Sequence, residues 1–458
     1  MVEYNDDMDK DVINYPLIGE RIEINNVESC KGNKEIYDSD RINEEENARS
    51  IFKRIFQCPH YFDDLSKLSP DEVRKQFEAT FGKHFEDLPI MLQETMIFVN
   101  FPGDTERLIT TKPDWLDMEK FIKGQTFARD NLAGLFVGQL YGLLCLICHE
   151  DGLRTLTMTK KSHTPYLAFN RYLSTTERIR NWYTEDPWSD GTKANMDIQA
   201  VRRMHRTVRR KLCELDYDEI EAIGTIKNPY CPAFPVIQKD FCTSICPDTI
   251  ENFVYTQNAL CPYRPKSINQ IEMSFTLFGF MGMVVLFPHE FGVYPKSDED
   301  LENFCHVWRS IGYLLGIDDD VNICRGSLED IKQRCQEYLD VLVKPAFQRI
   351  SPQWEHMSRC IFEGFGYCFP SFSFEVSVLR IADLLNIEMP GLYASLTYGD
   401  WIKYKFGKYF FQWGLKFAII RNWCNKMLNK IVDKALNIDK TKRAEIVEKS
   451  RNSMLHVE

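Results

Sequence analysis

Apolar residues recur three and four positions apart along the chain from about Ile51 onward, whereas the apolar–polar alternation of half-buried strands is almost absent. The segment PDEVRKQFEATFGKHFEDL, Pro70–Leu88, opens with a proline and two acids, as the first turn of a helix commonly does. Leu301–Ile317 is amphipathic at the same period, and Ser327 with Asp330 forms a capping-box pattern. These patterns predict an all-α protein.

Two runs are apolar on every face: NLAGLFVGQLYGLLCLIC, Asn131–Cys148, and MSFTLFGFMGMVVLF, Met273–Phe287. The first is at the lower limit of the length that crosses a bilayer, and the second is shorter than a span requires. Helices that are hydrophobic all round also form the centres of large helical cores, and we expect that role for both runs. Between Gly224 and Asn269, prolines and cysteines interrupt the pattern, which predicts a long surface excursion.

The segment QAVRRMHRTVRRKL, Gln199–Leu212, places His205 among five arginines and a lysine. On a helix capped by Asn195 or Asp197, His205 falls on the inner face. Its companions there are apolar, and the arginines take the flanks and the outer face: Val201, Met204, Val208 and Leu212 inside, with Arg202, Arg203, Arg206, Arg209 and Arg210 outside. A histidine in this setting is more commonly a core imidazole bonded to the backbone than a ligand, and the pattern alone favours the commoner role.

The preceding helical segment, Pro165–Tyr183, carries Arg171 and Thr175 one turn apart beside an inward apolar stripe. Both side chains can reach into one pocket, and a partly buried guanidinium suits a propionate or an oxygen-derived anion. The commoner alternative is a rim arginine followed by a threonine that bonds back to its own helix. The local pattern leaves that alternative standing.

The composition limits the classes of function. The 458 residues carry a net charge of -11, which argues against a nucleic-acid partner. Residues 1–50 hold fourteen acidic and six basic residues and are expected to be a loose acidic tail. The start of the chain lacks the apolar core of a signal peptide, and the fifteen cysteines are scattered. We therefore expect an intracellular protein with reduced thiols, in the cytoplasm or at the cytosolic face of the endoplasmic reticulum.

Residues 398–438 differ from the rest because aromatic and basic side chains alternate there, from Trp401 through Trp413 to Trp423 with eight lysines and arginines between and around them. A basic, aromatic-rich amphipathic segment can lie at a membrane surface. Alternatively, the aromatic rings can pack on the core while the lysines extend into solvent. The sequence favours neither alternative over the other.

Two cysteine patterns point to cofactors only weakly. Cys145, Cys148 and His149 form the C-x-x-C-H pattern of covalently attached haem, but they lie inside an apolar run where cysteine serves as a small hydrophobe. A second set, Cys231, Cys242, Cys246 and Cys261, lacks the paired C-x-x-C spacing of zinc sites. Neither pattern is taken as a cofactor site.

Several ordered blocks, PDWLDMEKFIKGQ, RYLST, DPWSDGTKA, VRRMH, MSFTLFGFMG, FPHEFG and FCHVWRSIGYLLGIDDDVNIC, resemble a known family over residues 113–343. It is the catalytic-domain family of ER-bound oxygenase mpaB and rubber oxygenase (latex clearing protein). The resemblance implies an all-α, globin-like bundle that binds haem b and uses O2 to cleave a carbon–carbon double bond in an isoprenoid chain. Matched by position, His205 is the proximal iron ligand, and Arg171 and Thr175 are the distal Arg-x-x-x-Thr pair.

Two departures separate this chain from the rubber-cleaving members. Ser174 stands where they have a lysine, and Thr155 stands where they have an acid proposed as a base; Glu150 and Asp151 are the nearest acids. His306 is a second candidate for haem contact, although a histidine that tethers two helices is the commoner case. Haem binding is therefore predicted more strongly than the cleavage mechanism.

The sequence thus predicts three parts: an acidic tail over 1–50, a helical catalytic domain over 51–390 and a basic, aromatic C-terminal extension over 391–458. The expected activity is a haem-dependent oxygenase acting with O2 on a hydrophobic small molecule or lipid, with peripheral membrane contact through 398–438. The alternatives are a helical scaffold without turnover and a haem-binding sensor or carrier of the same fold.

Overall fold

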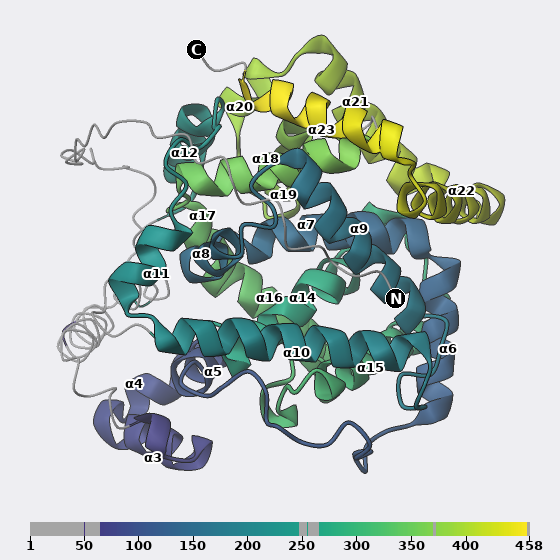
Figure 1. Ribbon diagram of the computed structural model, residues 1–458. Helices are drawn as coiled ribbons and strands as arrows, with labels where there is room; N and C mark the ends of the chain where they lie inside the picture. Colours follow the sequence, from purple (N-terminus) through teal and green to yellow (C-terminus); the bar gives the residue numbers. More distant parts are fainter. Residues whose placement is uncertain (1–49, 51–64, 247–253, 255–264, 370–371, 456–458) are drawn as a thin grey trace, which may run out of the picture. The chain divides into compact units, whose positions relative to one another are not determined.

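The computed structural model describes residues 50, 65–246, 254, 265–369 and 372–455. Helices joined by turns and loops make up this part of the chain (Figure 1). Within these ranges there is no β-strand, only a single bridge between Pro102 and Asn269. The prediction of an all-α protein is confirmed. The helices that matter below are α5 (Ile90–Phe98), α6 (Met118–Asp130), α7 (Leu132–Leu146), α8 (Glu150–Met158), α9 (Pro165–Trp182), α10 (Lys193–Glu214), α14 (Gln270–Leu286), α15 (Asp298–Leu314) and α16 (Leu328–Glu337).

The remaining elements complete the chain order. They are η1 (Leu65–Lys67), α3 (Pro70–Phe81), α4 (Lys83–Glu86), α11 (Tyr217–Gly224), α12 (Phe234–Ser244), η2 (Pro288–Phe291), η3 (Asp319–Val321), η4 (Tyr338–Val343), α17 (Lys344–Phe347), α18 (Pro352–Gly366), α19 (Phe374–Leu384), α20 (Pro390–Ser395), α21 (Tyr398–Tyr409), η5 (Phe410–Gly414), α22 (Ala418–Leu436) and α23 (Lys440–Leu455). The described residues belong to one compact unit, Glu46–Glu458, which includes the predicted C-terminal extension. The predicted acidic tail, apart from Ser50, lies outside the described residues.

The two apolar runs form α7 and α14, and most of their residues are buried, 11 of 15 in α7 and 13 of 17 in α14, as predicted. The helices approach closely because glycines face each other: a Cβ added to Gly142 would stand 2.2 Å from the carbonyl oxygen of Gly279. Among the described helices, none alone has the length and hydropathy to cross a membrane, and α7 with α8 meets that test only as a pair bent by 104°. The centre of the core is thus built on a glycine-mediated helix crossing.

Helices α9 and α10 follow each other and carry the predicted site residues. The hydroxyl of Thr164 caps α9 ahead of Pro165, and the hydroxyl of Thr192 caps α10. The expected cap of α10 at Asn195 or Asp197 is therefore wrong, because the turn before the helix offers a threonine three residues earlier. The capping box of Ser327 with Asp330 at the start of α16 is confirmed.

The faces of α10 differ from the prediction at two positions. Met204, predicted on the inner stripe, is 42% exposed, and Arg202, predicted on the flank, is only 5% exposed. Arg202 is buried because the loop before α6 folds over that flank and brings Asp104 to it, with 2.5 Å between the charged atoms. Asp104, the partner that allows Arg202 to be buried, lies 98 residues before it in the sequence.

The predicted excursion between Gly224 and Asn269 is partly helical. It contains α12, whose Ile237 and Phe241 are fully buried, and Phe241 stacks on Phe347 with ring centroids 4.8 Å apart. Prolines at the start of α12 mask its helical period in the sequence, since proline is tolerated in the first turn. Residues 247–253 and 255–264 of this segment lie outside the described part of the chain.

Candidate functional site

His205 lies on α10 with its side chain half-buried. Its Nδ1 is enclosed by protein, and no hydrogen bond reaches that nitrogen from the described residues. Burial lowers the pKa of the imidazole to about 4; the nearby Arg171 lowers it further, and Asp104 opposes the shift. The ring is therefore neutral near pH 7 and keeps a buried nitrogen without a partner, which is the state in which imidazole binds a metal.

Arg171 lies on α9, close enough to His205 to act on its charge. Its guanidinium donates hydrogen bonds to the hydroxyls of Thr159 (3.2 Å) and Ser162 (3.3 Å). Both of these hydrogen-bond partners are neutral hydroxyls, which do not cancel the positive charge of Arg171, so the guanidinium can still attract an anion. The predicted arginine and histidine thus lie on two successive helices, near enough for the guanidinium to lower the pKa of the imidazole.

The hydroxyl of Thr175 donates back to the carbonyl oxygen of Arg171 at 3.1 Å, the local bond expected of the commoner alternative. Thr155 makes the same kind of bond, to the carbonyl oxygen of Asp151 at 3.0 Å. Ser174, which directly precedes Thr175 on α9, is half-buried. The positions that depart from the rubber-cleaving pattern are therefore occupied by neutral side chains. The nearest acids, Glu150 and Asp151, form the first turn of α8, and Asp151 pairs with Arg154 at 3.0 Å.

The two central helices each have one face that is not fully covered by protein. On α14 the half-buried residues Glu272, Thr276 and Phe280 follow one another at four-residue intervals, while most of the helix is buried. On α7 the corresponding stripe is Gln139, Leu143 and Leu146. The side chains along these two stripes therefore stay partly accessible, while the other faces of both helices are mostly buried.

Shared neighbours show that these two stripes lie together. The amide of Gln139 donates to the Tyr183 hydroxyl at 3.2 Å, and Tyr183 meets Trp308 edge-on with ring centroids 6.1 Å apart. Phe280 stacks on the same Trp308 at 4.8 Å. The partly open faces of α7 and α14 therefore meet near the end of α9. Leu143, Leu146 and Phe280 are the apolar members of these faces, and Gln139, Thr276 and Glu272 are the polar members.

Glu272 is the residue that the sequence reasoning missed. Burial raises the pKa of its carboxyl to about 7, and the charge of Asp151 adds to that effect, while a hydrogen bond from the backbone N–H of Ile268 (2.5 Å) opposes it. Arg209, one turn beyond His205 on α10, donates to the Ser267 carbonyl at 3.0 Å and also acts on Glu272. The sequence contained a signal for this residue, because Glu272 is the single acidic residue in the otherwise mostly apolar helix Gln270–Leu286.

Asp104 fixes the helix that carries His205. Its carboxylate accepts two hydrogen bonds from Arg202 and one from Arg206. These two arginines stand before and after His205 on α10, so Asp104 holds the helical turn that contains the histidine. Burial alone would raise the pKa of Asp104, but the hydrogen bonds from the two arginines outweigh it and lower the pKa to about 2. No motif in the sequence identifies this residue.

His306 lies on α15, and its contacts come from the segment that leads into α6. Its Nε2 accepts a hydrogen bond from the backbone N–H of Asp117 at 3.1 Å, and its ring meets Trp115 edge-on at 5.7 Å. Asp117 is the N-cap of α6. This is the tethering contact that the sequence allowed as the commoner alternative, and contact with a haem stays a prediction.

The C-x-x-C-H residues are engaged in the core. Cys145 and Cys148 are buried, burial raises the pKa values of both thiols, and the Cys148 thiol donates to the Cys145 carbonyl at 2.9 Å. The Nε2 of His149 lies 3.0 Å from the Tyr338 hydroxyl. Buried, protonated thiols inside a core are the hydrophobic role predicted for them.

No group of three or more His, Cys, Asp or Glu side chains suited to a metal ion occurs among the described residues. Of the weak zinc set, Cys231 and Cys242 donate to the carbonyls of Pro229 and Gln348. Cys261 lies outside the described residues.

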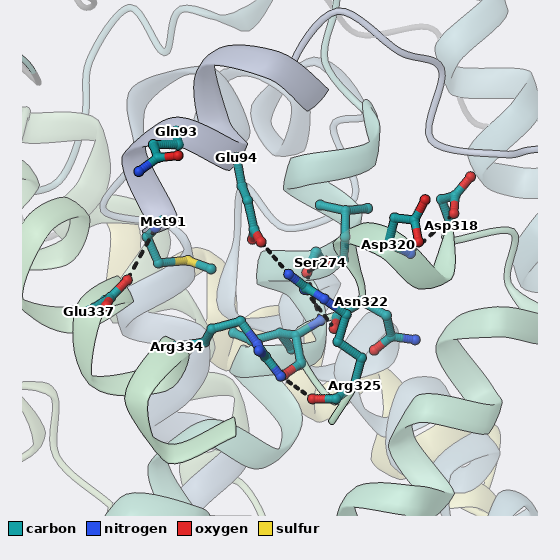
Figure 2. Close-up of polar contacts among 12 residues, drawn as sticks. Met91, Gln93, Glu94, Ser274, Asp318, Asp320, Asn322, Arg325, Arg334 and Glu337 are labelled. Atoms are coloured by element: carbon teal, nitrogen blue, oxygen red, sulfur yellow. Dashed lines mark hydrogen bonds and ion pairs between the residues drawn. The ribbon is translucent and has the colours of Figure 1, made fainter. Parts of the chain in front are cut away.

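A second buried cluster of charges holds the fold together away from this site. Figure 2 shows Glu94 of α5 paired with Arg325, and Arg334 of α16 donating to the Arg325 carbonyl. Ser274 of α14 donates to the Val321 carbonyl at 2.6 Å. These contacts fasten the η3 turn between three helices. Glu94 pairs through Oε1, whereas its Oε2 is buried and has no hydrogen-bond partner among the described residues.

Comparison with known proteins gives no family assignment. No family model matches this chain, and no curated protein matches it. A solved structure described as latex clearing protein LCP in the closed state aligns with 85% of this chain and 89% of that chain, at 15% identity and a TM-score of 0.46.

Proposed function

We propose that this protein is a haem b-dependent oxygenase that cleaves a carbon–carbon double bond of a lipophilic, isoprenoid-like substrate with O2. The observation that carries the proposal is His205, whose neutral imidazole keeps a buried nitrogen without a hydrogen-bond partner. Leaving such an atom unsatisfied costs about 1–3 kcal/mol, so a ligand is expected to satisfy it. The resemblance of the ordered blocks to the mpaB and rubber oxygenase family implies an iron ligand at the same residue and supports the proposal.

The residues around His205 fit a haem in three respects. His205 would hold the iron, and the apolar side chains on the partly open faces of α7 and α14 would contact the macrocycle and the hydrocarbon substrate. Arg171 would attract a propionate or orient a polarised oxygen, because its present partners are neutral hydroxyls. Bound haem would supply the iron chemistry that activates O2.

The protein's own side chains would do the rest. Leu143, Leu146 and Phe280 would exclude water from the double bond, since they line the partly open faces with hydrocarbon. Glu272 would hold or release a proton at its carboxyl oxygen, because its pKa lies near 7. Each cleavage would consume one O2 and convert the two alkene carbons into two carbonyl groups.

Absorption spectra of the purified, haem-supplemented protein test the cofactor. We expect a Soret band and extractable haem in a pyridine haemochrome assay for the wild type. His205→Ala should shift or abolish the band, whereas Met204→Ala should not, since Met204 is the exposed neighbour of His205. Well-folded protein without stoichiometric haem would overturn the proposal and leave the scaffold alternative.

Turnover is tested separately on the haem-loaded protein with a polyisoprenoid hydrocarbon. We expect O2 uptake matched by carbonyl products, and a loss of about a hundredfold or more in Arg171→Met, as for other residues that stabilise developing charge. Haem binding through His205 without products would favour a sensor or carrier.

A further inference from the structure

The outer face of α21 is apolar. Tyr398, Ile402, Phe406, Tyr409 and Trp413 follow one another at intervals of four, four, three and four residues, so they share one side of the helix and its η5 continuation. These side chains are between 45% and 77% exposed. An apolar stripe normally faces the core, whereas this one faces away from it.

The stripe continues into the first turns of α22. Phe417 is 64% exposed, Ile419 85% and Trp423 61%. Figure 1 shows α21 and α22 at the edge of the ribbon, in the yellow-green part of the colour range. We call the eight side chains named in this and the preceding paragraph the aromatic face.

The helices that carry the aromatic face are not detached from the protein, because their opposite side packs against the rest of the chain. The Tyr404 hydroxyl donates to Asp383 at 2.7 Å, and Leu428 and Val432 are buried. Leu415, between α21 and α22, is also buried. The body of the protein therefore holds these helices in place and presents the aromatic face outward.

Basic side chains surround the aromatic face. Residues 398–438 contain eight Lys and Arg and two Asp, a net charge of +6 in a chain whose total is -11. Lys416, Lys426 and Lys430 are exposed, and no described acid pairs with them. One of the two acids, Asp433, already pairs with Arg180 of α9 at 2.8 Å. The segment is thus strongly positive as well as apolar.

We propose that the aromatic face docks on the surface of a lipid bilayer that contains anionic headgroups. Tryptophan and tyrosine favour the interfacial region of a bilayer, and clustered lysines favour anionic lipid. A second copy of this chain is the less favourable occupant, because a symmetric contact would bring two +6 surfaces together and bury lysines, which interface cores exclude. The docking is peripheral and does not depend on the proposed oxygenase activity.

Vesicle co-sedimentation of the full-length protein tests the proposal. We expect binding to phosphatidylcholine vesicles that contain phosphatidylserine, and weaker binding to phosphatidylcholine alone. The double variant Phe406→Ser, Trp413→Ser should lower the partition coefficient by about tenfold or more, and Lys416→Glu, Lys426→Glu should lower it mainly on the anionic vesicles. Leu108→Ser is the matched control, since Leu108 is 73% exposed outside this segment and its loss should change nothing.

Sedimentation velocity in the absence of lipid tests whether the aromatic face binds a second copy of the chain instead. We expect the wild type and the Phe406, Trp413 double variant to show the same oligomeric state. Absence of binding to anionic vesicles in a folded wild type would overturn the proposal. A self-association that the double variant abolishes, without any vesicle binding, would assign the aromatic face to a second copy instead.

Discussion

Gly142 of α7 and Gly279 of α14 lie back to back where the two central helices cross, and a Cβ on Gly142 would stand 2.2 Å from the Gly279 carbonyl oxygen. The obstacle is backbone, so a rotamer change cannot relieve the overlap. The partly open faces of α7 and α14 depend on this crossing, because a wider separation would move both stripes.

Gly142→Ala is therefore expected to lower the free energy of unfolding by about 1–3 kcal/mol, as overpacking of a dense core does. Chemical denaturation of the cofactor-free protein measures it. Gly407→Ala in α21 is the control, because nothing lies within 4 Å of its Cβ position. That change should be neutral or stabilise by at most about 1 kcal/mol, since alanine favours helix. Equal loss in both variants would contradict the close crossing.

Asp104 should make stability depend on pH in the acid range. Its folded pKa of about 2 lies below the ordinary value, so its contribution is full above about pH 4 and is lost as the pH falls toward 2. The difference in unfolding free energy between wild type and Asp104→Asn should be about 2 kcal/mol or more at pH 7, because Arg202 would also lose its partner. The gap should narrow below pH 4, and a constant gap down to pH 2 would argue against the depressed pKa.

Arg171 should influence His205 directly. Burial is the main reason for the low pKa of His205, and the guanidinium of Arg171 adds to it. Arg171→Met is therefore expected to raise that pKa, as followed by NMR titration of the imidazole in cofactor-free protein. Thr175→Val removes no charge and should leave the titration where it was. An unmoved pKa in Arg171→Met would mean that the two side chains do not share a site.

Glu272 should act on stability in the opposite sense to Asp104. Its folded pKa of about 7 lies above the ordinary value, so the folded protein holds a proton that the unfolded chain releases above about pH 4.5. The folded protein therefore loses stability as the pH rises from 4.5 to 7.

Glu272→Gln removes that loss, and the variant should gain stability relative to wild type over this range, by at most about 3 kcal/mol at pH 7. Thermal unfolding at pH 5 and pH 7 measures it. A wild-type advantage that grows toward pH 7 would show that Glu272 is ionised in the folded protein.

The sequence by itself determined the helical class, the two central helices and the capping box at Ser327, because each depends on periodicity or on contacts within a few residues. It also drew attention to His205 and Arg171 through their spacing and family blocks. For the C-terminal segment it left two alternatives open, because a run of rings and lysines has the same composition whether the rings face inward or outward.

Only the tertiary structure decided which side chains share an environment. Arg202 is buried and Met204 exposed on α10 because a loop far away in sequence supplies Asp104 on one side of the helix. Burial raises the pKa of Glu272 and the charge of Asp151 raises it further, and no local pattern encodes either effect. Helical periodicity fixes which residues share a face of one helix, but burial and pKa depend on what the rest of the chain places against that face.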